Sequence, residues 1–442
     1  MTNTLEQLKS FIPVAPVFDV DQRTGFMAPE PPIPRLPDAW EAWEATLDAA
    51  IEAKLRLGDK IGLMESEATV SRQWRHSVRE LPVLPTKGLH DSAVLLRRAH
   101  LVLAYTLHFY VQSLPPSEEV LIPESIGVPL LEVSLKLDIP PLLTFSDTVL
   151  YNWDFRQGEK CEDSVPTPNN IRTQTMFTNL IDEEEFYLCS ARIELRGVEI
   201  LELMRVTMDE TFVGDAIAVS RIKEYLRTIA AVIGDLKELL LSVKEACDPD
   251  TYYNEVRPWF RGEDSAETTK KWVFEGLDKH RHLRFPTELS GPSAGQSSMV
   301  HVLDVFLGVD HQATSPGRPS FMSHMQSYMP RNHRLFLVHL KANPRPLRAF
   351  VVDANDAELL SAYNQAIMSL KEFRDAHMII ATLYILGPAR RVFKLANDIT
   401  EGNSNGTSTP STIWKPVKGT GGTELVKFLK DTRTRTSDTL IP

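Results

Sequence analysis

Apolar residues along this chain recur mainly at the three- and four-residue steps that place them on one face of an α-helix. Residues 11–37 hold seven prolines, each of which removes a backbone donor and restricts φ, so we expect an extended arm there. Asp38 and Glu41 then form a capping-box pattern, which predicts a helix start. The apolar face of that helix comprises Trp40, Trp43, Leu47 and Ile51. The segment 91–114 predicts a second helix, which is apolar on several sides and therefore deeply buried.

Helical periodicity continues through the later part of the chain. It is found in the segments 183–208, 216–246, 297–309, 320–341 and 356–386. Convincing alternating strands are few, so the period predicts an all-α fold, although Phe186 to Ile193 also fits a strand by its residue types. The charged, proline-containing stretch 154–172 predicts an interdomain loop. We therefore divide the chain into residues 1–160 and residues 173–442.

A polar segment lies near the C-terminus. Residues 397–412 are rich in Gly, Ser, Thr and Asn and have no apolar period, which predicts a mobile surface loop. This segment leads into the glycine-rich run Gly419 to Gly422. The composition therefore predicts that residues 397–423 form a lid.

Composition and charge exclude several classes of protein. A length of 442 residues with 43% hydrophobic and 24% charged residues indicates a folded protein of more than one unit. The net charge of −11 argues against nucleic acid as a partner, because phosphate binding needs clustered Lys and Arg. The three cysteines, Cys161, Cys189 and Cys247, have no C-x-x-C spacing, so neither a disulfide framework nor a thiolate metal site is indicated. We see no secretory signal and no apolar run of membrane-spanning length, so a cytoplasmic protein is expected.

The predicted helix 356–386 carries a histidine on its apolar stripe. Asn355 with Glu358 predicts its start, and Gly387-Pro388 predicts its end. The stripe consists of Tyr363, Ile367, Leu370, Phe373, His377, Ile380 and Tyr384. A buried imidazole needs a partner for each nitrogen, and iron coordination is one solution. Periodicity alone favours the other, a core histidine bonded to a carbonyl.

Other catalytic and metal-binding patterns are missing from the sequence. The remaining eleven histidines show no His-x-x-Glu-His or comparable spacing, and there is no nucleophile elbow, phosphate-binding loop or dinucleotide-binding glycine motif. Hydrolase, NTPase and dinucleotide-dependent functions are therefore not supported.

Three motifs in one order carry a family resemblance. They are Gly291-Pro-Ser-Ala-Gly-Gln-Ser-Ser298, Phe373-Arg-Asp-Ala-His377 and Lys418-Gly-Thr-Gly-Gly-Thr423. Upstream they are joined by Arg97-Arg-Ala-His100, Ile139-Pro-Pro141 with Asn152-Trp153, Phe186-Tyr-Leu-Cys-Ser190 and Tyr252-Tyr-Asn-Glu-Val-Arg257. Together they cover most of the chain, which resembles the indoleamine 2,3-dioxygenases.

The resemblance implies a small N-terminal helical domain packed on a large helical domain, with haem b between them and His377 as the proximal iron ligand. Arg257 matches the arginine that pairs with the substrate carboxylate; without the resemblance it would be interpreted as a surface charge. Arg374 and Asp304 match residues behind the haem propionates and the proximal ligand, where a helix-surface salt bridge would look the same. The other implied substrate contacts are Phe145, Thr148, Ser190, Tyr252, Gly291, Ser293, Ala294, Gly295, Gly419, Thr420, Gly421, Gly422 and Thr423.

The reaction implied by the resemblance is cleavage of the indole C2–C3 bond of L-tryptophan by O₂, giving N-formylkynurenine, the first step of the kynurenine pathway. The chemistry belongs to the haem iron, so no acid–base side chain is demanded. An electron donor for ferric haem and a monomeric chain are also expected. Phe145 and Tyr252 stand where some members carry Tyr and Phe, and Pro292 replaces a common glycine, which bears on substrate preference. The alternatives are a low-efficiency or non-catalytic haem protein of this fold, and a helical scaffold with no cofactor.

Overall fold

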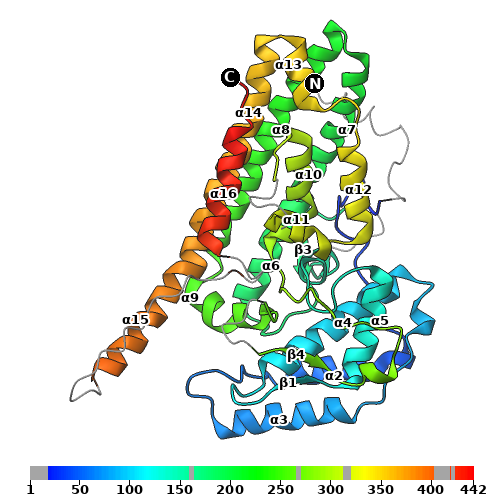
Figure 1. Ribbon diagram of the computed structural model, residues 1–442, viewed down its shortest axis with the longest axis vertical. Coiled ribbons are helices and arrows are strands. Elements are labelled where there is room, and N and C mark those ends of the chain that lie inside the picture. The colour runs from blue at the N-terminus through cyan, green and yellow to red at the C-terminus, as the bar shows by residue number, and fades with distance from the viewer. Residues whose placement is uncertain (1–17, 159–163, 265–269, 312–319, 403–418, 420–423) are drawn as a thin grey trace.

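The computed structural model describes residues 18–158, 164–264, 270–311, 320–402, 419 and 424–442 (Figure 1). Helices dominate these residues, and the strands among them are short and paired two by two. The all-α prediction is confirmed. In the described ranges, no helix combines the length and the apolar character that crossing a bilayer requires.

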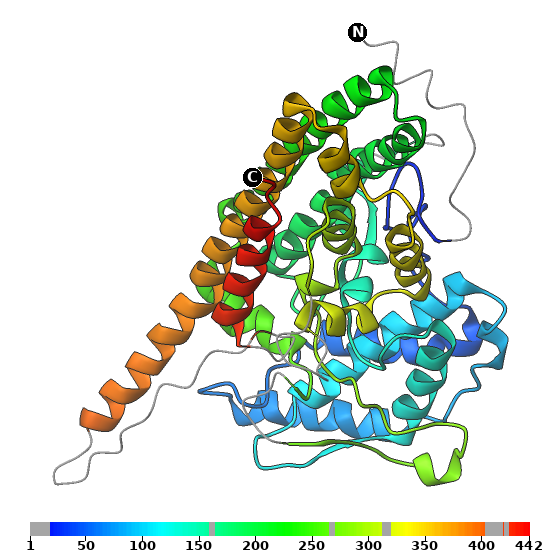
Figure 2. The ribbon, with the colours of Figure 1, turned by 45° about the horizontal axis from the view of Figure 1, so that its top comes forward.

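The N-terminal part of the chain builds one end of the molecule (Figures 1 and 2). Its helices are η1 (Asp38–Trp40), α2 (Glu41–Glu52), α3 (Glu65–Glu80), η2 (Lys87–Leu89), α4 (Ala93–Gln112) and α5 (Glu124–Leu137). Helix α4 begins after Ser92, whose hydroxyl accepts the Leu95 N–H at 3.3 Å, and nearly every residue of its last four turns is buried. Its deep burial agrees with the sequence prediction.

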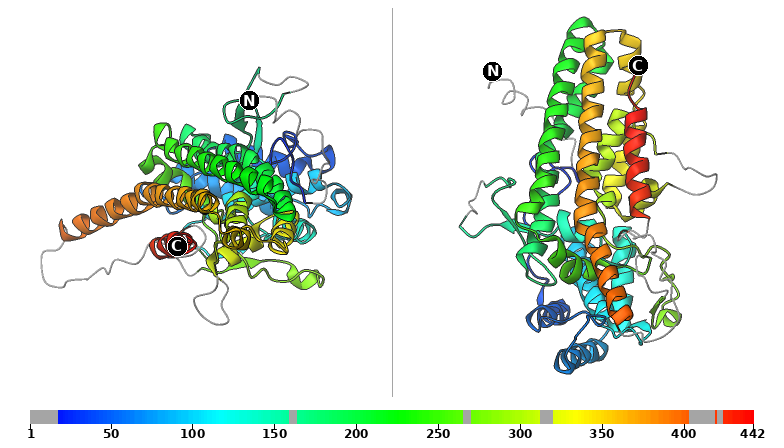
Figure 3. Two further views of the ribbon diagram at one scale, coloured as in Figure 1. Left: turned by 90° about the horizontal axis from the view of Figure 1, so that it is seen from above. Right: turned by 90° about the vertical axis from the view of Figure 1, so that its left-hand side faces the viewer.

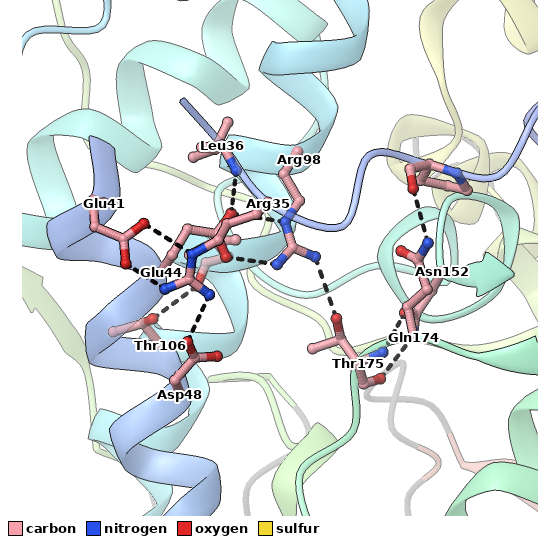
Figure 4. A network of polar contacts seen from close by, with 12 residues as sticks. Arg35, Leu36, Glu41, Glu44, Asp48, Arg98, Thr106, Asn152, Gln174 and Thr175 are labelled. Carbon is pink, nitrogen blue, oxygen red and sulfur yellow. Dashed lines mark hydrogen bonds and ion pairs between the residues drawn. The ribbon is translucent and has the colours of Figure 1, made fainter. Parts of the chain in front are cut away.

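The predicted capping box at Asp38 and Glu41 is wrong. Asp38 lies in the 3₁₀ turn η1, and α2 begins at Glu41 without a side-chain cap. The Glu41 carboxylate instead pairs with Arg35, which also contacts Asp48 on the next turns of the helix (Figure 4). The Glu41 side chain is therefore held in an ion pair and does not cap the helix start.

Behind α2, a buried ion pair joins the N-terminal helices (Figure 4). Arg98 on α4 donates to both carboxylate oxygens of Glu44, at 2.9 and 2.6 Å, and Glu44 also accepts the Leu36 N–H at 2.8 Å. Arg98 reaches Thr175 as well, at 3.4 Å. The pair thus fixes α2, α4 and the proline-rich arm to one another.

Two small sheets accompany the helices. Strand β1 (Val120–Ile122) pairs in parallel with β4 (Trp272–Phe274), and β2 (Trp153–Phe155) pairs antiparallel with β3 (Ile171–Thr173). The second pair lies at the two ends of the predicted interdomain loop. The domain division itself stays a prediction.

The later helices are longer. They are α6 (Ile181–Arg196), α7 (Val198–Val213), α8 (Ala216–Ser242), α9 (Pro249–Thr251), α10 (Ser298–Leu307), α11 (Phe321–Met325), α12 (Arg331–Lys341), α13 (Leu347–Ala354), α14 (Ala357–Ala381), α15 (Gly387–Gly402) and α16 (Leu425–Asp438). Short 3₁₀ turns separate them: η4 (Val243–Glu245), η6 (Arg257–Phe260), η7 (Leu277–Lys279), η8 (Ala294–Gln296) and η9 (Gln326–Tyr328). Helices α8, α14 and α16 run side by side along the length of the molecule (Figure 3).

The five predicted later segments are helical, with two interruptions. The segment 183–208 divides at Gly197 into α6 and α7, and 320–341 breaks at Met329 and Pro330. The strand alternative for Phe186 to Ile193 is wrong, since these residues lie within α6. Tertiary packing against α8 outweighs their local strand preference.

Both ends of the helix that carries His377 differ from the prediction. Asp356, not Asn355, caps α14, because its carboxylate accepts the Leu359 N–H at 2.8 Å, while Asn355 adopts the left-handed conformation at the end of α13. The Gly387-Pro388 stop is wrong. Residues 382–386 form a wider π-helical turn, and α15 continues from Gly387. Pro388 is tolerated there because, near the start of a helix, the backbone N–H that proline lacks would not have been hydrogen-bonded within the helix anyway.

Helix α15 projects away from the body of the molecule (Figures 1 and 2). The backbone of residues 397–402 is helical, so the predicted mobile loop is wrong for these residues. The remainder of that prediction, except Gly419, lies outside the described residues.

Three π-helical turns occur in the described chain: η3 (Ser146–Leu150), η5 (Tyr252–Val256) and η10 (Thr382–Leu386). Such turns are rare and recur at functional sites. All three border the same cavity, described next.

Candidate functional site

A two-chambered cavity lies among α6, α14, α16 and the segment around η3. Both chambers open partly to solvent; the space within them, including that open part, is about 1100 Å³ for the first and about 980 Å³ for the second. The residues that border both are Phe145, Phe186, Ser190, Ala294, Gly295, His377, Ile380, Tyr384 and Phe428. Because these walls are shared, the two chambers form one site, and it is mostly apolar.

His377 projects from α14 into both chambers. In the described part of the chain, no group hydrogen-bonds either ring nitrogen. Burial and, to a smaller extent, the neighbouring positive charge of Arg374 together lower the pKa of His377 to about 4. The imidazole is therefore neutral at ordinary pH and presents a nitrogen lone pair to the cavity.

Arg374, one turn before His377, also borders the first chamber. Its guanidinium donates to Asp304 on α10 and to the Thr436 hydroxyl on α16, and Asp304 also contacts His311 Nε2 at 2.7 Å. Burial raises the pKa of Asp304, but Arg374 and His311 outweigh burial and hold it below the ordinary value. The predicted partners Arg374 and Asp304 thus meet in a buried ion pair, not on a helix surface.

The turn η3 forms one wall of the second chamber through Thr148 and its neighbour Phe145. The Phe145 N–H donates to Gln296 Oε1 at 2.8 Å, and Gln296 Nε2 donates to the Gly291 carbonyl at 2.9 Å. The Thr148 hydroxyl donates to the Thr144 carbonyl at 3.3 Å. Gln296 therefore fixes the spacing between η3 and the loop on the opposite side.

That loop supplies Pro292, Ser293, Ala294 and Gly295 to the second chamber, whereas Gly291 borders neither chamber. A Cβ atom on Gly291 would lie 1.9 Å from the Phe260 carbonyl oxygen. Only glycine allows this approach of two backbones. The close packing of the Gly291 backbone against Phe260 therefore explains why a glycine is needed at this position.

Tyr252 borders the second chamber, and Arg257 lies near Tyr252. The Tyr252 ring packs against Phe186, with ring centroids 4.3 Å apart, and burial raises the pKa of the phenol. Arg257 is buried, with its guanidinium 5.4 Å from the Tyr253 ring centroid, and does not itself border either chamber. Gly419 borders the second chamber, and Thr420 to Thr423 lie outside the described residues.

Several wall residues were missed by sequence reasoning. They are Phe186, Phe260, Ile380, Tyr384 and Phe428. Ile380 and Tyr384 share the stripe of His377, and Phe186 and Phe260 lie within or beside recognised motifs, so these four carried a signal. Phe428 carried none.

Glu194 was also missed. It is fully buried beside the first chamber, where Oε1 accepts the Ser297 hydroxyl at 2.6 Å and Oε2 has no hydrogen-bond partner among the described residues. Burial raises the pKa of Glu194 to about 7. The carboxyl is therefore partly protonated near neutral pH.

These features fit a largely apolar cofactor that a single histidine nitrogen would hold. Among the described residues, no group of three or more His, Cys, Asp or Glu is arranged to hold a bare metal ion. The unbonded imidazole of His377 in an apolar chamber, with Arg374 beside it, matches the single-histidine ligation of haem b.

Comparison with known proteins agrees with this geometry. The family model for indoleamine 2,3-dioxygenase matches residues 14–439. Indoleamine 2,3-dioxygenase 1 of Mus musculus is 30% identical, covering 84% of this chain and 85% of its own length. The indoleamine 2,3-dioxygenase of Saccharomyces cerevisiae is 31% identical, covering 86% and 90%. A 6-hydroxytryptophan 2,3-dioxygenase of Fusarium equiseti is 27% identical, covering 93% and 94%.

Proposed function

Because this chain belongs to the indoleamine 2,3-dioxygenase family, we propose that it is a haem-dependent dioxygenase that cleaves the C2–C3 bond of L-tryptophan with O₂, giving N-formylkynurenine. The single observation that carries the proposal is His377, an imidazole without a hydrogen bond to any described residue, in an apolar chamber. In this proposal haem b, held by His377, supplies the activation of O₂ once an electron donor has reduced it. The chain acts as a monomer.

The protein's own residues bind and orient the substrate. The aromatic wall of Phe145, Phe186 and Tyr252 receives the indole ring and excludes water from it. Arg257 is buried close to Tyr252, and in this proposal its guanidinium supplies the charge that pairs with the substrate carboxylate. Fixing both ends of the substrate lowers the entropy cost of reaching the reactive geometry.

Other residues of the first chamber would hold the cofactor in place. Arg374, which is held by Asp304, lines the first chamber, where its guanidinium would pair with a haem propionate. Ser190, Ala294 and Gly295 lie at the junction of the chambers, where small side chains leave space for both cofactor and substrate.

A single-site variant tests the assignment of the iron ligand. His377→Gly should purify with little haem, seen as a lost Soret band, and added imidazole should restore the band by occupying the vacated position. The control is His333→Gln, which changes a buried histidine that borders neither chamber and should leave haem content unchanged. Full haem content in His377→Gly without imidazole would refute the assignment.

Turnover tests the substrate. The reduced protein should convert L-tryptophan to N-formylkynurenine, followed by its absorbance. Because one relative is named for 6-hydroxytryptophan, ring-hydroxylated tryptophans are measured alongside. Haem binding without turnover of any of these substrates would favour the non-catalytic alternative.

A further inference from the structure

His108 lies on the buried helix α4, outside both chambers, and both of its ring nitrogens are engaged. Nδ1 lies 2.7 Å from the Trp259 carbonyl oxygen, and Nε2 lies 3.2 Å from the Leu143 N–H nitrogen. A carbonyl only accepts and an amide N–H only donates, so the proton must be on Nδ1 and the ring must be neutral. Burial, which lowers the pKa of His108 to about 4, agrees with this state.

The two partners of His108 border neither chamber, but each lies close in sequence to a residue that lines the second one: Trp259 precedes Phe260, and Leu143 lies two residues before Phe145. Trp259 lies in η6, the short turn that begins with Arg257. Leu143 lies at the entry to η3. One side chain therefore links the backbone next to Arg257 to the backbone next to Phe145.

Two other polar residues of α4, His100 and Gln112, each reach only one of these segments. His100 contacts the Asp147 carboxylate at 2.7 Å and the Pro140 carbonyl at 3.1 Å, which holds the η3 side. Gln112 donates to the Arg261 carbonyl at 2.7 Å, which holds the η6 side. His108 stands between them and contacts both sides.

We propose that His108 is a positioning residue, which holds Arg257 at a fixed distance from the aromatic wall at Phe145 and so sets the preference for substrates that carry a carboxylate. This inference rests on the proposed roles of Arg257 and Phe145. A substrate that is bound at both ends reacts efficiently only when the two contacts are correctly spaced, and a displacement of about 1 Å can lower the rate about a hundredfold.

Two substitutions separate the two bonds. The amide of Asn reaches the position of Nδ1, so His108→Asn can keep the bond to Trp259, whereas Gln reaches the position of Nε2, so His108→Gln can keep only the bond to Leu143. Thr106→Val is the control, because Thr106 is buried on the same helix and bonds only the Val102 carbonyl within it.

The measured quantity is the ratio of kcat/KM for tryptophan to that for tryptamine, which lacks the carboxylate. His108→Gln should lower this ratio about tenfold or more, mainly through KM for tryptophan, with haem content unchanged. His108→Asn, which keeps only the bond to Trp259, breaks the link at its other end and should lower the ratio as well, whereas Thr106→Val should not move it. Equal losses for both substrates in His108→Gln would overturn the proposal.

Two readouts do not depend on turnover. The ratio of tryptophan to tryptamine affinities, measured from the Soret shift, should change in the same variants, so a wild type that oxidises neither substrate would refute the proposed reaction and still test His108. Histidine ¹⁵N NMR, assigned by the signal lost in His108→Gln, should show a neutral ring protonated on Nδ1 at neutral pH. A cationic ring, or a proton on Nε2, would also overturn the proposal.

Discussion

Replacing Asp304 by leucine should strongly destabilise the fold and loosen the cofactor. Asp304 and Arg374 are both buried, and Arg374 contacts Asp304 and the Thr436 hydroxyl. Asp304→Leu leaves the guanidinium buried with only the hydroxyl as a partner, and removes the carboxylate that faces His311. Breaking one side of a buried ion pair costs about 3–5 kcal/mol, because the remaining charge is not compensated.

This loss of stability is large relative to the total free energy of unfolding of a typical protein. Proteins are stable by about 5–15 kcal/mol, so the loss is roughly a third of the total free energy of unfolding. The urea midpoint should fall in proportion. The double variant Asp304→Leu with Arg374→Met leaves neither charge buried and should recover most of the loss.

The assay is urea unfolding of the four proteins of the cycle, with Soret absorbance per mole of protein measured in parallel. The control is Glu44→Leu, which breaks the buried Glu44–Arg98 pair, whose two residues border neither chamber. It should lose similar stability and keep its haem, whereas Asp304→Leu should lose both. If the double variant loses as much stability as the sum of its singles, the two residues are not coupled and the reasoning is wrong.

Three further predictions concern the cavity. Arg257→Leu removes a charged contact worth about 1.5–3 kcal/mol and should lower kcat/KM for tryptophan about ten- to a hundredfold, with tryptamine nearly unaffected; parallel losses would argue against carboxylate recognition. The pKa of Glu194 is about 7 in the folded protein against an ordinary 4.5, so its protonation stabilises the fold. This stability is complete below about pH 4.5 and is lost as the pH rises through 7. Glu194→Gln should therefore raise the free energy of unfolding, measured by urea titration, by up to about 3 kcal/mol at about pH 8 but not at about pH 4, and a pH-independent effect would contradict this assignment. Gly291→Ala forces a Cβ against the Phe260 carbonyl and should destabilise by about 1–3 kcal/mol, whereas Gly234→Ala, with open space around it, should not; equal stabilities would refute the packing argument.

Sequence periodicity was sufficient for the helix that carries His377, because its apolar stripe extends over many turns. It failed at the ends of that helix, where Asp356 competes with Asn355 for the cap and a π-helical turn carries the chain past Gly387. Local motifs do not contain the information that decides these ends, since it comes from packing against α8 and η5.

The cavity residues likewise fall into those that the sequence predicted and those that it did not. Residues within recognisable motifs, such as Ser190 and Tyr252, were predicted, and the structure brings them to one cavity. Phe428 and Glu194 were missed, because each reaches the cavity through tertiary packing and belongs to no motif that points there. The bridge through His108 was equally invisible, since Leu143 and Trp259 are far apart along the chain.

The three π-helical turns have a consequence for how this chain can change over evolutionary time. Each turn holds one more residue than an α-helical turn, and deleting one residue would rotate everything beyond it by about 100° around the helix axis. Thr148, Tyr252 and Tyr384 lie inside these turns and face the cavity. Substitutions there alter the lining of the chamber, but single-residue insertions or deletions would remove a wall altogether. Gaps in an alignment of functional relatives should therefore avoid all three turns, even where the amino acids themselves differ.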